Sequence, residues 1–388
     1  MNHPFDYPAN LTQESTNSML ERFFAAILLP ILVAGLSAPS VVRGEPLPDI
    51  RIDSDGKAFV TAEGNPFRPW GVNYDHNEST GGLIEDYWAE DWEVIEEDFQ
   101  EIRDLGANVI RIHLQVGRFL DSPRQPNKAN LERLGDLLQL AEKTGLYLDL
   151  TGLGCYHMQD VPEWYSTLPE EKRWDAQARF WEEIANTCRE SSAVFCYDLM
   201  NEPIVPGKPE QDWLAGELGG KHFVQRLVLD PGDRDRSAIA KAWVDRMVTA
   251  IRKRDSRHLV TVGVIPWALS FPGAKPFFYS PEVGENLDFV SVHFYPRKGE
   301  VDKALEALAV YQVGKPVVVE ETFPLHCSTP ELIEFMDRAE AKDIAQGWIC
   351  FYWGKSEKEY AEEKGDLASA LKRAWLEAFR KRGADRDR

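Results

Sequence analysis

Beyond about Pro46, short apolar segments alternate along the chain with longer segments in which apolar positions recur every three or four residues. Short apolar runs bounded by turn residues predict buried strands, whereas the longer spacing predicts helices with one apolar face. The predicted strands are 68–73, 108–113, 146–151, 194–200, 259–264, 289–295, 317–321 and 348–353. The predicted helices are 92–105, 131–144, 175–189, 238–254, 301–312, 330–341 and 367–380. The interval between the fifth and sixth strands is the exception, because it is aromatic and rich in proline.

Eight strands that alternate with helices predict an α/β fold of the (β/α)8 TIM-barrel type. An open doubly wound sheet is the competing architecture, but no glycine-rich phosphate-binding turn follows the first strand in RPWGVNYDH. Ahead of the first barrel strand, residues 50–67 alternate between apolar and polar around two turn sequences, which predicts a short N-terminal β-hairpin of two strands. We therefore expect 45–388 to form a single barrel domain, with this hairpin and with long βα loops after strands 3 and 4.

The N-terminal part of the chain carries a different signal. Residues 23–36 (FFAAILLPILVAGL) form the one uninterrupted apolar run, which is too short to span a bilayer comfortably and leads into small residues. This layout is typical of a secretory signal, so we expect 1–44 to be an N-terminal extension whose signal is cleaved between Ala38 and Gly44. The first eighteen residues are unusual ahead of such a signal, and a translation start at Met19 would remove them. The protein is then expected to be secreted or periplasmic, and a lipid-anchored or signal-anchored form stays open as the alternative.

Composition narrows the classes of partner. The 388 residues are 43% hydrophobic and 28% charged, which excludes a disordered chain, and five cysteines without a CxxC pair give no support for a zinc-knuckle or thioredoxin-type site. With 44 basic and 64 acidic residues, the net charge is −20, which argues against binding of nucleic acid or of an anionic membrane. We expect no nucleic-acid partner, no stable membrane partner and a monomer, and the charge is compatible with a neutral ligand such as a sugar.

Polar residues at the carboxyl ends of barrel strands are candidates for chemistry, because these ends meet at the mouth where active sites form. The period of two along 317–321 places Glu321 on the face of Val317 and Val319, and Glu320 on the opposite face. Glu202 and Glu321 lie on opposing strands, which suits retaining glycoside hydrolysis: one carboxyl protonates the leaving oxygen and the other attacks the anomeric carbon. Five of the eight strands have such ends, namely Arg111 with His113, Asn201 with Glu202, His293 with Tyr295, Glu320 with Glu321, and Tyr352 with Trp353.

The segments DLMNEP (198–203) and KPVVVEE (315–321) resemble those of glycoside hydrolase family five, a cellulase-like family of clan-A (β/α)8 retaining enzymes. The resemblance covers nearly all of the mature chain, including the hairpin turns, Asn73 on strand one and the polar ends of strands two, six and eight. It implies that Glu202 is the acid/base and that Glu321 is the nucleophile, because the family's nucleophile stands at the offset of Glu321 from Pro316. The resemblance also implies that Asn201 holds the 2-hydroxyl, Arg111 and Tyr295 hold the nucleophile, His293 positions the acid/base, and Trp353 is the floor on which the sugar stacks.

Strand three departs from the family pattern, because a histidine usually ends it and here LDL (148–150) runs into Thr151. His157, six residues further on, is a candidate to reach the same space, and His113 shares a face with Arg111. The loop 152–173 also carries Trp164. This loop and the loop 204–236 are long enough to narrow the cleft into a pocket for short chains or chain ends.

The expected function is a retaining β-glycoside hydrolase that acts on a β-linked glucan, mannan or related oligosaccharide by a two-glutamate double displacement, without a cofactor or a metal. Three alternatives stay open: a transglycosylase on the same scaffold, a metal-dependent barrel enzyme, and a barrel that binds sugar without turnover. The metal-dependent alternative could draw ligands from a set of five side chains, although neither HxH nor HExxH occurs in the sequence. That set is His113, Asp198, Glu202, His293 and Glu321.

Overall fold

The computed structural model describes residues 47–74, 81–351, 353–363 and 365–386, which belong to the unit Arg43–Arg388. The predicted N-terminal extension and secretory signal, 1–44, lie outside the described residues, and so does Tyr352. Within the described ranges, no helix is long and apolar enough to cross a membrane.

Parallel strands form the centre of the fold. The sheet order β13-β9-β8-β5-β4-β17-β16-β15-β14 begins and ends with two pieces of one chain segment, so the ring of strands closes across residues 259–264. The TIM barrel predicted from the sequence is thus confirmed, and the carboxyl ends of its strands meet at one mouth. The strands are β4 (Trp70–Asn73), β5 (Val109–Gln115), β8 (Tyr147–Gly154), β9 (Val194–Asp198), β13 (Leu259–Thr261), β14 (Gly263–Val264), β15 (Val290–His293), β16 (Val317–Glu321) and β17 (Gly347–Cys350).

The fifth barrel strand is broken at Val262, between β13 and β14. Tyr279, which is 2% exposed, places its hydroxyl in the gap and accepts hydrogen bonds from the backbone N–H groups of Val262 (3.1 Å) and Ser291 (2.9 Å). Tyr279 belongs to the aromatic and proline-rich interval, which holds the short helices α8 (Trp267–Ser270) and η2 (Phe277–Tyr279) where a long helix is found elsewhere in the barrel. The break sets the position of Gly263 beside the mouth.

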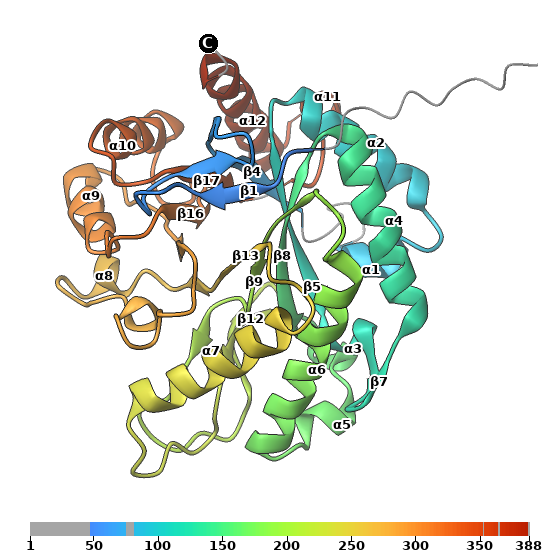
Figure 1. Ribbon diagram of the computed structural model, residues 1–388. Coiled ribbons are helices and arrows are strands. Elements are labelled where there is room, and N and C mark those ends of the chain that lie inside the picture. The colour runs from blue at the N-terminus through green and yellow to red at the C-terminus, as the bar shows by residue number, and fades with distance from the viewer. Residues whose placement is uncertain (1–46, 75–80, 352, 364, 387–388) are drawn as a thin grey trace, which may run out of the picture. The chain divides into compact units, whose positions relative to one another are not determined.

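Helices surround the strands (Figure 1). Their ends follow capping chemistry: Asn127 accepts a hydrogen bond from the Asn130 N–H at the start of α4, and Ser328 forms a capping box with Glu331 at the start of α10. Gly145 ends α4 with a left-handed φ of 75°, which favours glycine. All the predicted helices are present, with shifted ends: α2 (Trp92–Asp104), α4 (Lys128–Thr144), α6 (Glu170–Cys188), α7 (Arg236–Arg252), α9 (Val301–Ala309), α10 (Thr329–Ala341) and α12 (Leu367–Arg386).

A small antiparallel sheet closes the barrel at the amino ends of its strands. It consists of β1 (Ile50–Ile52), β2 (Phe59–Thr61) and β3 (Pro66–Phe67), so the segment forms three strands where two were predicted. Phe59 packs edge-on against Phe195 and Phe289, with ring centroids 5.3 Å apart in both pairs. This apolar cluster fills the barrel interior near the amino ends of the strands. The polar groups of the interior lie towards the carboxyl ends of the strands.

The long loops after strands three and four carry secondary structure of their own. The first contains η1 (Met158–Asp160) and α5 (Glu163–Ser166), and the second contains β10 (Pro203–Ile204), β11 (Leu214–Leu218) and β12 (Lys221–Arg226). The two loops meet, because the His222 N–H donates to the Tyr156 carbonyl at 2.8 Å and the rings of Tyr156 and Phe223 lie 5.2 Å apart. The remaining short elements are α1 (Ile84–Tyr87), α3 (Val116–Phe119), β6 (Leu120–Ser122), β7 (Gln125–Pro126) and α11 (Glu357–Glu362).

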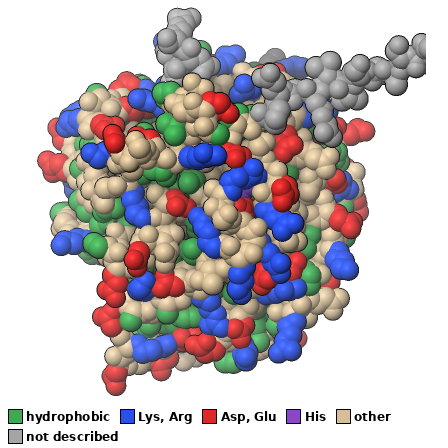
Figure 2. Space-filling view, in the orientation of Figure 1, with side chains coloured by type: hydrophobic (Ala, Val, Ile, Leu, Met, Phe, Trp, Pro, Cys, Tyr) green, Lys and Arg blue, Asp and Glu red, His purple; other side chains and the backbone are tan. Residues whose placement is uncertain are grey.

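Acidic and basic side chains are interspersed on the face drawn in Figure 2. Many of the exposed charges pair between neighbouring helices, as Arg246 of α7 does with Glu171 of α6 at 2.9 Å and Arg254 with Glu182 at 2.7 Å. Exposed pairs of this kind contribute about 0–1 kcal/mol each.

Candidate active site

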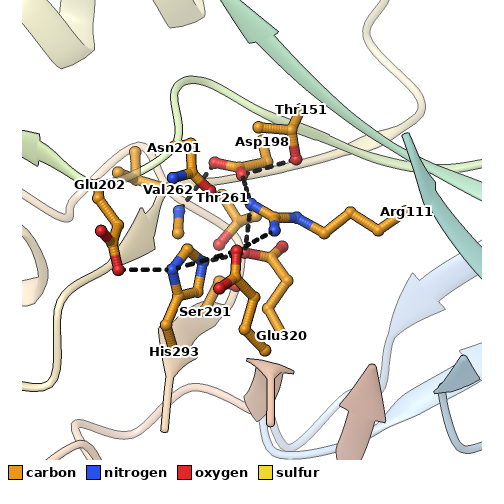
Figure 3. A network of polar contacts seen from close by, with 12 residues as sticks. Arg111, Thr151, Asp198, Asn201, Glu202, Thr261, Val262, Ser291, His293 and Glu320 are labelled. Atoms are coloured by element: carbon orange, nitrogen blue, oxygen red, sulfur yellow. Dashed lines mark hydrogen bonds and ion pairs between the residues drawn. The ribbon is translucent and has the colours of Figure 1, made fainter. Parts of the chain in front are cut away.

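Arg111 lies at the centre of the polar network at the mouth (Figure 3). The side chain projects from β5 and is fully buried, and its guanidinium makes four hydrogen bonds. Burial alone would lower the pKa of Arg111, but the neighbouring carboxylates raise it above its ordinary value, so the group remains charged. One cation thus holds together the ends of the first, second, fourth and seventh barrel strands. Its partners are Glu321 Oε1 (2.7 Å), Asn73 Oδ1 (2.9 Å), Asp198 Oδ2 (2.9 Å) and Asn201 Oδ1 (2.9 Å).

Glu321 is held through both carboxylate oxygens at the rim of β16. Arg111 donates to Oε1, and the Tyr295 hydroxyl donates to Oε2 at 2.9 Å. The Glu321 side chain is 11% exposed, so it is accessible at the mouth. Burial and the carboxylate of Glu321 hold the pKa of Tyr295 well above its ordinary value, and the phenol therefore remains a donor. The two hydrogen bonds hold the Glu321 carboxylate in one orientation.

Glu202 follows the fourth barrel strand in a strained conformation. Its φ of +48° lies in the left-handed region, which costs a residue other than glycine about 1 kcal/mol. The backbone is fixed there because the Glu202 N–H donates to the Gly263 carbonyl at 2.9 Å, and Pro203 follows directly. The side chain is 18% exposed, and its Oε1 lies 2.9 Å from His293 Nδ1. The left-handed backbone at Glu202 thus occurs at a residue whose carboxyl group points to the mouth of the barrel.

His293 lies between the two glutamates. Its Nδ1 is 2.9 Å from Glu202 Oε1 and 3.5 Å from Glu321 Oε1, and the ring is fully buried. Burial alone would lower the pKa of His293, but Glu321, Glu202 and Glu320 together raise it to about 10. The raised pKa favours the protonated ring beside Arg111.

Beneath the rim lies a layer of buried carboxyl groups, of which Asp149 was not predicted from the sequence, Asp198 was predicted only as a metal ligand, and Glu320 was predicted only as a polar strand end. Glu320, Asp198 and Asp149 are each 0% exposed. Burial raises the pKa of Asp149 and of Asp198, whereas Arg111 and His293 outweigh burial and lower the pKa of Glu320. Thr151, at the position where a family member usually has histidine, donates its hydroxyl to Asp198 Oδ2 at 2.9 Å. The alternation along 317–321 placed Glu320 and Glu321 on opposite faces of the strand, but it did not indicate which face points into the barrel.

Two further predicted residues join this network. Asn201 is 2% exposed, accepts from Arg111 and donates its amide to the Phe223 carbonyl at 2.8 Å, which ties the loop after strand four to the site. His113 is also 2% exposed; its Nε2 lies 3.4 Å from Asn73 Oδ1 and its Nδ1 contacts the Tyr156 hydroxyl. Tyr156, which no motif indicated, thus reaches the group from the loop in which His157 was expected to do so.

The side chains of the remaining predicted residues do not join this group, although the Trp353 backbone N–H donates to the Asn73 carbonyl at 2.6 Å. Trp353 is 1% exposed, lies beside Asp98 of α2 and borders a surface hollow that includes Leu105. The Trp353 ring is thus enclosed in this structure, and its role as a stacking floor stays a prediction. His157 and Trp164 are half-buried in the loop after β8. In the part of the chain that the structure describes, no hydrogen bond or ion pair joins either one to Glu202 or Glu321.

The positions of the acidic side chains at the mouth give no support to the metal-dependent alternative. No group of three or more His, Cys, Asp or Glu side chains among the described residues is placed to hold a metal ion. Asp198, Glu202 and Glu321, which such a site would use, each have one carboxyl oxygen paired with Arg111 or His293.

A β/α barrel with one glutamate at the rim of its fourth strand and a second at its seventh defines a class of protein, the barrel glycoside hydrolases. The family model described as cellulase, glycosyl hydrolase family 5, matches residues 60–353, which is more than half of the chain. The chain therefore belongs to glycosyl hydrolase family 5 and is a glycoside hydrolase, as the resemblance in sequence indicated.

Individual relatives are more distant. A probable mannan endo-1,4-β-mannosidase C from Aspergillus terreus is 26% identical over 188 residues, which are 43% of this chain and 42% of the relative, so the chain spans less than half of that protein. Among solved structures, an exo-β-1,4-mannosidase from an Opitutaceae bacterium superposes with a TM-score of 0.63 at 18% identity, covering 87% of this chain and 62% of that one. The catalytic domain of a Thermobifida fusca endoglucanase gives 0.55 at 18% identity, covering 87% and 97%. At these identities the solved structures support the fold alone.

Proposed function

We propose that this protein is a retaining β-glycoside hydrolase with Glu321 as nucleophile and Glu202 as acid/base. The observation that carries the proposal is the single His293 nitrogen that contacts both carboxylates, at 2.9 Å and 3.5 Å. Two oxygens that contact the same nitrogen belong to neighbouring carboxyl groups, and retaining enzymes hold their two carboxyl groups only about 5–5.5 Å apart. The geometry supports direct attack of one carboxylate on the anomeric carbon.

In the first step, a Glu321 oxygen forms a bond to the anomeric carbon while the bond to the leaving oxygen breaks. Arg111 and Tyr295 hold the carboxylate in one orientation through hydrogen bonds to its two oxygens. The family resemblance assigns Asn201 to the sugar 2-hydroxyl, and the Arg111 and Phe223 contacts hold its amide at the mouth. The product is a covalent glycosyl-enzyme with inverted configuration at the anomeric carbon.

Glu202 serves both halves of the reaction. In the first half it gives its proton to the leaving oxygen, and in the second half its carboxylate takes a proton from the water that attacks the glycosyl-enzyme. The second inversion restores the original configuration. Because the nucleophile must be ionised and the acid protonated, a bell-shaped dependence of kcat/KM on pH follows.

The substrate class rests on relatives and on the loops. The Aspergillus terreus relative is named a mannan endo-1,4-β-mannosidase, and the two solved structures are named an exo-β-1,4-mannosidase and an endoglucanase. These names support a β-linked mannan, glucan or related oligosaccharide as substrate. The contact between Tyr156 and the β11–β12 hairpin supports a narrowed cleft that takes short chains or chain ends. The proposal further includes a protein that acts as a monomer, without a cofactor or a metal.

The test is hydrolysis of aryl β-glucoside, β-mannoside, β-xyloside and β-cellobioside, with the configuration of the first-formed sugar followed by NMR. Release of the β-anomer first is expected, because two inversions give net retention. Release of the α-anomer first would contradict the double displacement. Failure to cleave any of the four glycosides, with mannan and β-glucan oligosaccharides also left intact, would contradict the substrate class.

We also propose that the protein is exported through 23–36 and that 45–388 is its single catalytic domain. The apolar run followed by small residues supports this, although it lies outside the described residues. N-terminal sequencing of the protein recovered from outside the cytoplasmic membrane is expected to begin between residues 39 and 45. Retention of 23–36 in the exported protein would contradict cleavage.

A further inference from the structure

His293 has a second carboxylate contact that the roles proposed above do not use. Its Nδ1 faces Glu202, and its Nε2 lies 3.4 Å from Glu320 Oε2 inside the barrel. Figure 3 shows the ring between these two carboxyl groups. Against the effect of burial, Arg111 and His293 lower the pKa of Glu320 to about 2. With Glu320 ionised, two protonation states make both contacts: a doubly protonated ring that donates at each nitrogen, or a neutral ring that donates to Glu320 and accepts the Glu202 proton at Nδ1. The second state would turn the acid proton of Glu202 towards His293.

The charges around His293 favour the doubly protonated ring. Glu320 and Asp198 are fully buried, and Glu321 is nearly so. These three carboxyl groups surround Arg111 and His293, so an imidazolium leaves less buried negative charge unbalanced than a neutral ring would. An unbalanced buried charge costs several kcal/mol. The charged or titratable groups that face His293 are Glu202, Asp198, Arg111, Glu320, Glu321 and Tyr295.

The backbone of the broken fifth strand packs at Gly263 against the side chains of Glu320, His293 and Asp198. A Cβ added to Gly263 would lie 2.5 Å from Glu320 Oε2, 2.7 Å from His293 Nε2 and 3.1 Å from the Asp198 carboxylate. Real Cβ atoms do not approach so closely, so the position requires glycine. The Gly263 N–H donates to Asp198 Oδ1 at 2.8 Å, and its carbonyl accepts from the Glu202 N–H. The Glu320–His293 contact is thus enclosed by groups that also set the position of Glu202.

We infer that Glu320 is a positioning residue of the proposed hydrolysis: its carboxylate keeps His293 doubly protonated, so that Nδ1–H donates to Glu202 Oε1 and the acid proton of Glu202 resides on Oε2. Glu320 acts through His293 and does not touch the substrate. When Glu202 gives up its proton to the leaving oxygen, the imidazolium stabilises the carboxylate that forms. The inference rests on the proposed function, in which Glu202 is the acid/base.

The protonation of His293 can be measured without turnover. In protein with ¹⁵N-labelled histidine, both ring nitrogens of His293, assigned by comparison with His293→Asn, are expected to show imidazolium shifts throughout pH 6–8. A neutral ring in the wild-type enzyme at pH 7 would overturn the inference. This measurement is independent of the substrate panel, so a failure of the proposed function and a failure of the inference are told apart.

The pH profile of Glu320→Gln tests the link to catalysis. With its counter-charge removed, His293 is expected to become neutral near pH 7, and Glu202 and Glu321 both lose a neighbouring cation. Both limbs of the kcat/KM profile should then move to higher pH by about one unit, because loss of an adjacent cation raises the pKa of a carboxyl group. Limbs that move to lower pH would mean that His293 stays charged without Glu320. Unmoved limbs with reduced activity would mean a structural role, and either result would overturn the inference.

Asp149→Asn is the matched control, because Asp149 is as fully buried as Glu320 but forms no ion pair with His293 among the described residues. Its limbs are expected to stay at the wild-type pH, and limbs that move as far as those of Glu320→Gln would overturn the assignment to Glu320. Thermal unfolding of each variant checks that the barrel is intact. If Glu320→Gln does not fold, Glu320→Asp retains the charge and should keep the wild-type limbs, and the wild-type ¹⁵N spectrum still decides the protonation of His293.

Discussion

Glu321→Gln is expected to lower kcat by roughly 10⁵-fold, the scale on which loss of a covalent nucleophile acts in a hydrolase. The amide has the size of the carboxylate and can still accept a hydrogen bond from Arg111, so the mouth is expected to keep its shape. It lacks the nucleophilic oxygen that forms the glycosyl-enzyme. The measurement is kcat on the aryl glycoside that the wild-type enzyme cleaves best, with KM expected to change far less than kcat.

Glu320→Gln is the internal control for this result, because the two residues are adjacent and the substitutions are chemically identical. Glu320 faces the interior and is fully buried, whereas Glu321 is accessible at the rim. The Glu320 variant is therefore expected to turn over with a displaced pH profile, while the Glu321 variant is inactive at every pH. An active Glu321→Gln beside an inactive Glu320→Gln would move the nucleophile to Glu320.

The barrel could be predicted from sequence because its signals are local. Each strand is a short apolar run and each helix has one apolar face, so the alternation alone defined the architecture. The two glutamates were also accessible to prediction, since each ends a strand and barrel strand ends converge at the mouth. Their contacts were not, because the Arg111–Glu321 hydrogen bond joins residues 210 positions apart.

Trp353 and Glu320 illustrate what a strand pattern leaves undecided. Every residue of β16 is buried, so the run VVVEE does not distinguish the interior of the barrel from the helix-facing side. Trp353 lies beyond the end of β17 at Cys350, where the chain path and not the period of two sets the direction of a side chain. Its indole consequently packs beside Asp98 of α2. Positive φ at Glu202 and the break at Val262 depend on tertiary contacts and leave no trace in the pattern.

Glu202→Ala is expected to separate substrates by the quality of their leaving group. For a sugar or an alkyl leaving group, which must be protonated as it departs, loss of a general acid should lower kcat/KM by about 10²–10⁴-fold. For a dinitrophenyl leaving group, which departs as a stable anion, the loss in kcat/KM should be small, since attack by Glu321 needs no proton. Hydrolysis of the glycosyl-enzyme still lacks its base, so this intermediate accumulates after a burst.

Two further readouts distinguish an acid/base from a residue that merely supports the fold. The alkaline limb of the wild-type kcat/KM profile should be absent from Glu202→Ala with the dinitrophenyl substrate, because the group that titrates there has been removed. Azide should restore turnover by entering the space left by the carboxyl group, and it should give a β-glycosyl azide, since a second inversion needs no base when the nucleophile is already an anion. Equal losses with good and poor leaving groups, together with no response to azide, would contradict the assignment, because a disrupted mouth slows every substrate alike.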